Sequence, residues 1–406
     1  MGLKTICQMY DVAIVGGGPT GCFAGKLLAE RGLDVVVIEE HAEIGHPMCC
    51  AGVVGVEGLR ELGIGPGRWV LNELRGAMLY PPWGSPLSLS RGRAEALVIN
   101  RAAFDRELAA SAARAGADFL MRSKCVDVSV GERVRIKVRT DGRLREISSK
   151  LVMGADGPNS LVARRAGLLR SHQLINCAQV EVLADVDAET AEIYLGREYA
   201  PGFFAWAVPA GELCRVGVGT AEGSALGKLK KLLREHPAVS GKVDRDKLMH
   251  LTAGPIPRPL TRAMYADGVM LVGDAAGQVK PLTGGGIYVG LSCARLAAEV
   301  AAEALECGDV SARVLCKYER AVGRKFGEEF ELGMRAWRLF LQLSDEDLCS
   351  LFRVLAEPDV KALILEQADF DHHGKVISAL ARRGPSLLRS LGLGRLVRYA
   401  RHMLKK

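Results

Sequence analysis

The sequence contains no long hydrophobic run and no paired-cysteine metal motif. No uninterrupted apolar stretch reaches the roughly 18 residues that a membrane-spanning helix requires. Eleven cysteines are present, but no two are spaced as C-x-x-C, which argues against a zinc ribbon, an iron–sulfur site or a disulfide framework. The N-terminal residues 1–11 are short and polar, unlike a secretory signal. The sequence therefore predicts a soluble cytoplasmic protein with reduced thiols.

Aromatic residues are also scarce, at 5% of the chain, whereas glycine is abundant at 47 residues. The hydrophobic fraction of 49% and the charged fraction of 25% are those of an ordinary globular protein, which excludes disorder as a main feature. A chain of 406 residues is long enough for two or three structural units. The many glycines predict tight turns and close backbone approaches.

Acidic residues are absent from the C-terminal segment 375–406, which holds nine Lys or Arg, more than the whole net charge of +7. Nucleic-acid recognition needs a basic surface with aromatic or polar readers, and this segment has one aromatic residue, Tyr399. We therefore expect no nucleic-acid partner. After Pro385, leucines approximate one helical face, which favours peripheral attachment to an anionic membrane surface. A basic face that docks on the protein itself is equally compatible.

Two apolar runs, 12–15 and 35–38, flank a helical pattern at 22–31. Continuous apolar strands are typical of a parallel sheet that is covered on both faces. Alternating short strands over 176–220 predict instead a mixed or antiparallel sheet. Further patterns predict helices at 104–115 and 285–305, a hairpin at 126–138, strands at 151–155 and 268–274, and mostly helices from 311 onward.

The first apolar run leads into a glycine motif, Gly16-x-Gly18-x-x-Gly21, and Glu39 follows the second run. Glycines in this pattern allow a tight turn and a close approach to a pyrophosphate, and the following helix offers free N–H groups to the phosphates. A carboxylate after the second strand accepts hydrogen bonds from the adenosine ribose. The pattern predicts a dinucleotide site.

Two later clusters indicate which dinucleotide binds. The first, 154–160, follows a buried strand and contains Asp156 and Gly157. In the second, Asp274 follows the strand at 269–272 and precedes the glycines 284–286. An acid and glycines at a helix start suit the ribityl and pyrophosphate part of FAD, and the positive end of that helix favours an anionic reduced flavin. These clusters favour FAD over NAD.

The three clusters together resemble those of the FAD-dependent hydroxylase-type flavoprotein superfamily, which includes para-hydroxybenzoate hydroxylase. The segment Asn100-Arg101-x-x-Phe104-Asp105-x-x-Leu108 resembles the helix of that superfamily whose arginine contacts the flavin. The resemblance implies a Rossmann-like fold around FAD.

A narrower resemblance is to the geranylgeranyl reductases, most of all the archaeal digeranylgeranylglycerophospholipid reductases. Residues 43–50 match their form EIGxPxxC, with Cys50 at the family cysteine. Residues 204–209 resemble YxWxFP, with Phe204 and Val208 in place of Tyr and Phe, and 216–219 match VGxG. The resemblance runs from about residue 10 to beyond residue 350.

This resemblance implies an FAD site and an isoprenoid site. Beside the glycines Gly16, Gly18 and Gly21, the expected FAD contacts are Thr20, Glu39, Cys50, Ala51, Arg101, Val126, Asp274, Gly286 and Ile287. The expected substrate-binding residues are Phe204, Trp206, Val208 and Pro209. Cys50 is also the candidate catalytic residue, for shaping the pocket or supplying a proton; a buried packing thiol is the alternative.

The implied reaction is reduction of the C=C bonds of geranylgeranyl chains in archaeal ether phospholipids. An isoprenoid alkene has no carbonyl to store developing charge, so the reduced flavin must lie against it in a dry pocket while a proton reaches the neighbouring carbon. No histidine or glutamate stands out as the proton donor. No second dinucleotide fold is evident, so the electrons are expected from an external carrier such as ferredoxin or F420.

Three alternatives stay open from the sequence, and the least favoured of them is a non-enzymatic flavin-binding or structural role. A related reductase would act on geranylgeranyl diphosphate or another prenyl side chain. An FAD-dependent aromatic monooxygenase would use the same scaffold with NAD(P)H and oxygen. The segments at 47–52 and 204–209 favour reduction.

The predicted fold is α/β, with a Rossmann-like FAD-binding domain containing a parallel sheet, an inserted substrate domain with a mixed or antiparallel sheet, and a helical C-terminal region. The predicted boundaries are 1–75, 98–175 and 263–310 for the FAD-binding domain, 76–97 and 176–262 for the substrate domain, and 311–406 for the helical region.

Overall fold

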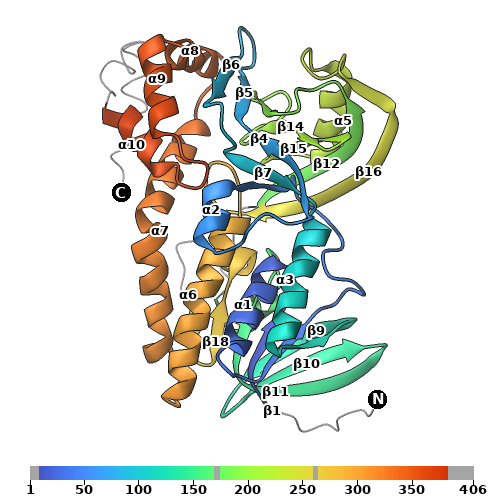
Figure 1. Cartoon of the computed structure of the whole chain (residues 1–406), viewed down its shortest axis with the longest axis vertical. Coiled ribbons are helices and arrows are strands. Elements are labelled where there is room, and N and C mark those ends of the chain that lie inside the picture. The colour runs from blue at the N-terminus through green and yellow to red at the C-terminus, as the bar shows by residue number, and fades with distance from the viewer. Residues whose placement is uncertain (1–8, 169–173, 259–263, 383–406) are drawn as a thin grey trace.

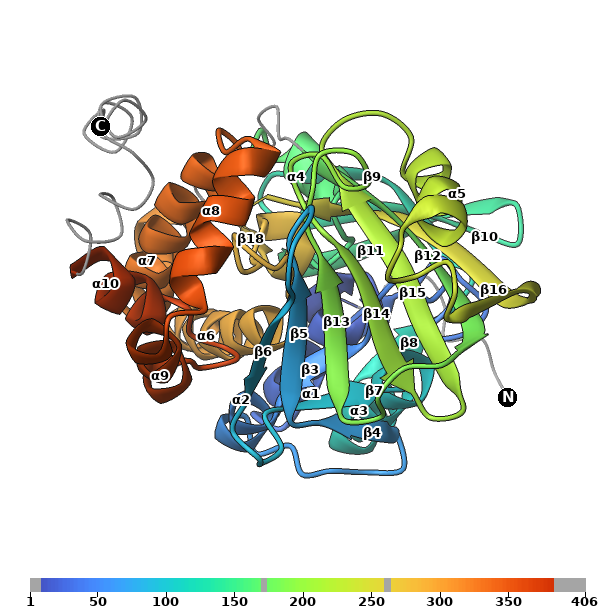
Figure 2. The ribbon, with the colours of Figure 1, turned by 90° about the horizontal axis from the view of Figure 1, so that it is seen from above.

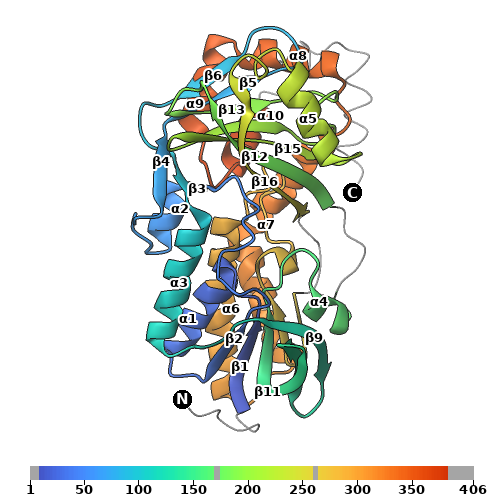
Figure 3. The ribbon, with the colours of Figure 1, turned by 90° about the vertical axis from the view of Figure 1, so that its right-hand side faces the viewer.

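The computed structural model describes residues 9–168, 174–258 and 264–382 (Figure 1). Two large β-sheets lie toward opposite ends of this part of the molecule, and a small third sheet lies between them (Figures 1 and 3). The long helices α6 (Ile287–Glu306) and α7 (Ala312–Phe340) run along one side. The flavin motifs and the predicted substrate motif therefore belong to different sheets.

The first sheet is built on parallel strands in the order β18, β11, β1, β2 and β8. Strand β17 is antiparallel at one edge, and β9 and β10 continue antiparallel from β11. The strands are β1 (Met9–Val15), β2 (Val35–Ile38), β8 (Asp118–Leu120), β9 (Ser123–Val130), β10 (Val134–Thr140), β11 (Arg143–Gly154), β17 (Tyr265–Ala266) and β18 (Val269–Leu271).

Both faces of the parallel strands are buried, as the continuous apolar runs predicted. Val12 and Ile14 pack toward the helices α1 (Pro19–Ala29), α3 (Arg101–Ala115) and α6. Ala13 and Val15, which point the other way, pack against β9, β10 and the short helix α4 (Leu161–Arg165). One face is thus covered by helices and the other by a hairpin, so every side chain of the run is removed from water.

The second sheet has the order β16-β12-β15-β14-β13-β5-β6 and is antiparallel except where β13 meets β5 (Figure 2). Helix α5 (Ala225–Glu235) packs on one of its faces through leucines such as Leu229 and Leu232. The other face is turned toward the flavin motifs. The strands are β5 (Gly76–Tyr80), β6 (Leu87–Ser90), β12 (Leu174–Ala184), β13 (Thr190–Tyr194), β14 (Ala205–Ala210), β15 (Leu213–Thr220) and β16 (Val243–Pro257).

A three-stranded sheet that the sequence analysis did not predict joins these two parts. Its order is β3 (Val53–Gly55), β7 (Ala96–Ile99) and β4 (Val70–Leu74), and helix α2 (Val56–Glu61) follows β3. The predicted segment 76–97 is consequently split, because β5 and β6 lie in the seven-stranded sheet whereas β7 starts at Ala96 in the small one. The domain boundaries themselves stay a prediction.

The C-terminal region is helical, as predicted, with α7 followed by α8 (Asp345–Leu355), α9 (Pro358–Gln367) and α10 (Gly374–Arg382). Trp337 and Leu343 are buried, whereas Phe340 and Leu341 are only partly buried. Within the described ranges, no helix is long and apolar enough to cross a membrane. Most of the basic segment 375–406, including everything after Arg382, lies outside the described residues.

Candidate active site

The turn between β1 and α1 packs so closely that two of its three motif glycines have no room for a side chain. A Cβ on Gly16, whose φ is +109°, would lie 2.3 Å from the carbonyl oxygen of Ala155. A Cβ on Gly21 would lie 2.0 Å from the oxygen of Gly16. Gly18 instead faces open space, with nothing within 4 Å. The turn therefore holds strand against helix and leaves the start of α1 open to a ligand.

Glu39 follows β2 and is bonded to that same turn. Its Oε2 accepts a hydrogen bond from the backbone N–H of Gly17 at 2.7 Å, and its Oε1 accepts one from the N–H of His41 at 2.8 Å. The side chain is largely buried, and Glu39 does not line the cavity described below. Its contact with a ribose therefore stays a prediction.

Asp274 follows β18 of the first sheet, whereas Arg101 follows β7 of the three-stranded sheet, and both line the cavity described below. Asp274 lies in the 3-10 turn η1 (Gly273–Ala276) after β18, and a Cβ on Gly286 would lie 3.2 Å from its Oδ1. Burial raises the pKa of Asp274 to about 6, against the opposing effect of the Arg101 guanidinium. Arg101 therefore does not offset the burial of the Asp274 carboxyl group, as expected for a group that accepts hydrogen bonds from the hydroxyls of a ligand.

Arg101 begins α3 and is paired with Asp105 one helical turn later, through Nε at 3.0 Å and Nη2 at 2.9 Å. Burial lowers the pKa of Arg101, but the Asp105 carboxylate and the neighbouring Cys50 thiol outweigh it and keep the pKa above its ordinary value. The guanidinium therefore stays charged at the cavity wall. The bidentate pair fixes its orientation.

The segment that carries Cys50 is tied to the second sheet by two hydrogen-bonded connections. Gln179 on β12 donates from Nε2 to the Cys50 carbonyl at 3.3 Å, and its Oε1 accepts from the Trp206 Nε1–H at 3.0 Å. The buried Arg215 on β15 donates from Nη1 to the Ala51 carbonyl at 2.9 Å. The Cys50 thiol itself accepts from the Gly52 N–H at 3.2 Å. The aromatic wall and the family cysteine are consequently held in fixed relative positions.

The glycines of the VGxG motif make room for aromatic side chains from the preceding strand. A Cβ on Gly217 would lie 2.3 Å from the Trp206 ring, and a Cβ on Gly219 would lie 2.3 Å from the Phe203 ring. Phe203 stacks on Phe204 with ring centroids 4.2 Å apart. Bare backbone on β15 thus leaves the space that the Trp206 and Phe203 rings occupy.

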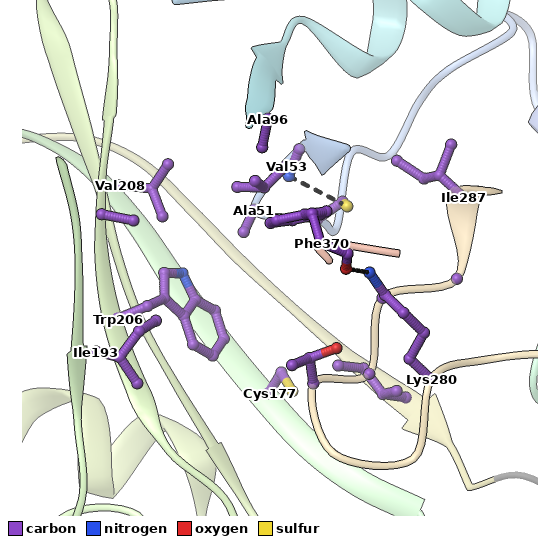
Figure 4. A pocket seen from close by; sticks show the side chains of 18 of the residues that line it. Ala51, Val53, Ala96, Cys177, Ile193, Trp206, Val208, Lys280, Ile287 and Phe370 are labelled. Atoms are coloured by element: carbon purple, nitrogen blue, oxygen red, sulfur yellow. Dashed lines mark hydrogen bonds between the residues drawn. The ribbon is translucent and has the colours of Figure 1, made fainter. Parts of the chain in front are cut away.

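One cavity of about 600 Å³ joins the flavin motifs to this aromatic surface (Figure 4). In Figure 4, Trp206, Val208 and Ile193 lie on one side of it, and Lys280 and Ile287 lie on the other. Of the predicted site residues, eleven line it: Gly18, Thr20, Cys50, Ala51, Arg101, Asp274, Gly286, Ile287, Phe204, Trp206 and Val208. Five do not: Gly16, Gly21, Glu39, Val126 and Pro209.

The sequence analysis missed a third wall, which the C-terminal region supplies. Phe370 and His373, on the connection between α9 and α10, line the cavity together with Lys280 of the flavin loop. Lys280 is buried and donates from Nζ to the Phe370 carbonyl at 2.6 Å and to Asp371 Oδ1 at 3.3 Å. Burial lowers the pKa of Lys280, while Asp371 opposes the shift. A lysine within an apolar stretch was the one available signal, and its partner lies 91 residues away.

The residues present fit FAD. The close-packed turn at Gly16 and Gly21, the open position at Gly18 and the weakly compensated Asp274 match a pyrophosphate and a polyol. The loop at 284–286 brings bare backbone to the cavity, where a flavin ring edge could receive N–H groups.

Comparisons with known proteins agree with this assignment. The FAD binding domain family matches residues 9–325. Digeranylgeranylglycerophospholipid reductase 2 of Methanopyrus kandleri is 34% identical and covers 98% of this chain and 100% of its own. Digeranylgeranylglycerophospholipid reductase of Methanothrix thermoacetophila is 37% identical over 87% of this chain and 93% of its own.

Solved structures give the same result. A geranylgeranyl bacteriochlorophyll reductase-like protein of Thermoplasma acidophilum superposes with a TM-score of 0.85 at 30% identity, covering 95% of this chain and 98% of its own. A halogenase in complex with FAD has a TM-score of 0.67 at 14% identity, covering 98% of this chain and 96% of its own, and shares the fold alone. The chain belongs to the family of FAD-dependent digeranylgeranylglycerophospholipid reductases.

Proposed function

We propose that this protein reduces the C=C bonds of geranylgeranyl chains in archaeal membrane ether phospholipids. The observation that carries the proposal is the single cavity lined by flavin motifs on one side and by Phe204, Trp206 and Val208 on the other. When bound there, FAD supplies a hydride from its reduced ring. An apolar wall suits an alkene that has no polar group near its reacting carbons.

The residues of the chain position the substrate and help to exclude water from the cavity. The hydrogen-bonded series Trp206–Gln179–Cys50 holds the aromatic wall at a fixed distance from the Cys50 segment. Phe370 lines the cavity from the C-terminal side. Excluding water protects the reduced cofactor and strengthens the electrostatic effect of the groups that remain.

Cys50 is the proposed catalytic residue, with a role in shaping the pocket or in proton supply. Its thiol lies beside the Arg101 guanidinium, which raises the local positive potential. The predicted FAD contacts, including Val126 and Glu39 outside the cavity wall, and the substrate contact Pro209 belong to the same proposal.

The electron donor in this proposal is an external carrier such as ferredoxin or F420, and the protein works at the membrane surface as a peripheral protein. The lipid nature of the substrate supports the peripheral location, because a lipid with geranylgeranyl chains resides in a bilayer.

The test is an anaerobic flavin reoxidation. The holoprotein is reduced with dithionite, and an unsaturated geranylgeranyl ether phospholipid is added while the visible flavin absorbance is followed. Oxidised flavin should reappear, and Trp206→Ala should slow its return while retaining the FAD content. Flavin that stays reduced with every prenyl lipid, and is reoxidised by oxygen only in the presence of a phenol, would identify a monooxygenase instead.

A further inference from the structure

A group of arginines lies at the edge of the cavity, beside the hairpin of β5 and β6. Gly76 of β5 is directly paired with Ser90 of β6, so Arg75 and Arg91 lie one position outside this last pair, at the open end of the hairpin. Both arginines line the cavity, together with Ser90. Two like charges at the end of one hairpin do not stabilise it. The placement therefore calls for an explanation beyond folding.

Each arginine is held by the backbone and by one carboxylate. Arg75 donates from Nη1 to the Gly92 carbonyl at 3.1 Å, and its Nε lies 2.9 Å from Glu189 Oε1. Arg91 donates from Nη1 to the Leu365 carbonyl at 3.4 Å and from Nη2 to Glu95. The backbone contacts orient the guanidinium groups. Further N–H groups of both remain for a ligand, because a guanidinium carries five donors.

The carboxylates do not neutralise this edge. Arg93 also pairs with Glu95, so three arginines share two glutamates. The Glu189 side chain is 61% exposed and that of Arg75 is 39% exposed. An ion pair this exposed contributes little to stability, so an incoming anion can displace Glu189 at low cost.

The arginines and the flavin motifs line different parts of the cavity, as the binding of a lipid with a charged end requires. The flavin motifs line the cavity from the first sheet, whereas Arg75 and Arg91 line it from the hairpin and from the neighbourhood of α9. Strand β6 lies beside α9 in both Figure 1 and Figure 2. Between the two ends the wall is apolar, with residues such as Ala77, Leu89 and Leu365. A molecule with an apolar chain and an anionic end fits this arrangement.

We propose that Arg75 and Arg91 form the subsite for the phosphate of the lipid headgroup, and that this contact sets how far the prenyl chain reaches toward the flavin. The inference rests on the proposed function. Arginine recognises phosphate through paired, charge-assisted hydrogen bonds, and two arginines that line the same cavity can both donate to such an oxyanion. Glu189 and Glu95 occupy the same donors when no lipid is bound.

The experiment compares substrates with and without the phosphate. Reduced holoprotein in neutral detergent micelles is offered a digeranylgeranylglycerol phospholipid and the corresponding neutral digeranylgeranylglycerol, and KM and kcat are measured for each. The variants are Arg75→Gln, Arg91→Gln and the double variant. Arg93→Gln is the matched control, because Arg93 pairs with Glu95 but does not line the cavity.

We expect KM for the phospholipid to rise about tenfold or more in each single variant, the size of one lost charge-assisted hydrogen bond. KM and kcat for the neutral lipid and the FAD content should stay near the wild-type values, which also shows that the variants fold. Arg93→Gln should resemble the wild type. Raising the salt concentration should raise KM for the phospholipid alone.

The inference is overturned if the double variant binds both lipids as the wild type does, or if both values of KM rise equally. A third substrate, geranylgeranyl diphosphate, separates the two sources of phosphate. If the arginine variants raise KM for the diphosphate but not for the phospholipid, the assignment to the phospholipid headgroup is overturned. If the wild type reduces none of the three substrates, the proposed function fails rather than the subsite.

Discussion

Single side chains set the shape of the aromatic wall. The Trp206 ring packs against β15 because Gly217 leaves the space that the ring occupies. An alanine at that position would place a methyl group 2.3 Å from the ring, closer than any real contact allows. The glycine is therefore required by packing against the tryptophan rather than by a turn.

Gly217→Ala should displace the Trp206 ring and break its hydrogen bond to Gln179. We expect kcat/KM for prenyl lipid to fall at least tenfold while FAD remains bound, because the substituted strand does not carry the flavin motifs. Gly227→Ala in α5 is the control, since its Cβ would make only ordinary contacts at 3.5 Å. Equal activity in the two variants would show that the ring position is unimportant.

Asp274 gives a pH-dependent contribution to stability in the apoprotein. Its pKa is about 6 in the fold and 3.8 in the unfolded chain, so the fold binds the proton more tightly. The contribution is fully present below the unfolded pKa and is lost as the pH rises through the folded pKa. A difference of this size corresponds to about 3 kcal/mol.

Asp274→Asn removes this titration without changing the shape of the side chain. Between about pH 4 and about pH 7, the free energy of unfolding of the wild-type apoprotein should fall relative to that of the variant by about 3 kcal/mol. Urea unfolding of both apoproteins at several pH values measures it. Parallel curves over that range would contradict the assignment.

At the scale of elements, the flavin loop and the C-terminal wall are joined by a buried ion pair. Lys280 and Asp371 are each about 4% exposed at the side chain. Burial raises the pKa of Asp371, against the attraction of Lys280. Each charge is therefore tolerated in the interior only because the other is present.

Lys280→Met should cost about 3 kcal/mol or more in the free energy of unfolding, because it leaves the Asp371 carboxylate buried without its cation. Adding Asp371→Asn should recover part of that loss, and the double-mutant cycle measures the coupling. Urea unfolding of the holoproteins provides the data. If the losses in unfolding free energy caused by Lys280→Met and Asp371→Asn simply add, the ion pair does not link the flavin loop to the C-terminal wall.

Elements whose signal is local could be predicted from the sequence. The apolar run 12–15, the glycine turn and the hairpin of β9 and β10 each involve neighbouring residues, so periodicity and turn chemistry identify them. The small sheet of β3, β7 and β4 could not be found in this way. Its strands have three to five residues and pair across long separations, as β3 does with β7.

The residues of the candidate site also fall into those that local motifs predict and those that only the fold brings together. Residues within motifs, such as Asp274, Arg101 and Trp206, were predicted and line one cavity. Phe370, Asp371 and His373 belong to no motif, and only tertiary packing brings them to the flavin loop. The arginines 75 and 91 likewise meet only because β5 and β6 pair in one register.

Considered as a whole molecule, the cavity proposed for FAD is lined by residues of both large sheets, so we expect cofactor binding and folding to be coupled. A ligand that binds only the folded state raises the free energy of unfolding with its concentration, by about 2.7 kcal/mol at one hundred times its dissociation constant. Urea unfolding of the apoprotein at increasing FAD concentrations should follow this relation.

Gly18→Glu provides the control for that titration. The glutamate side chain would enter open space, so the apoprotein should keep its stability, but its charge would repel the pyrophosphate. FAD should then leave the unfolding curve of the variant unchanged. A variant stabilised as strongly as the wild type would mean that the phosphates bind elsewhere.

The central claim is that reduced flavin and a prenyl chain meet in this one cavity. The most direct measurement is the mass of the lipid after anaerobic incubation with dithionite-reduced holoprotein. We predict a gain of two hydrogens for each double bond reduced, with Trp206→Ala slower than the wild type. A geranylgeranyl phospholipid recovered at its original mass, from a protein that carries its full content of reduced FAD, would contradict the account.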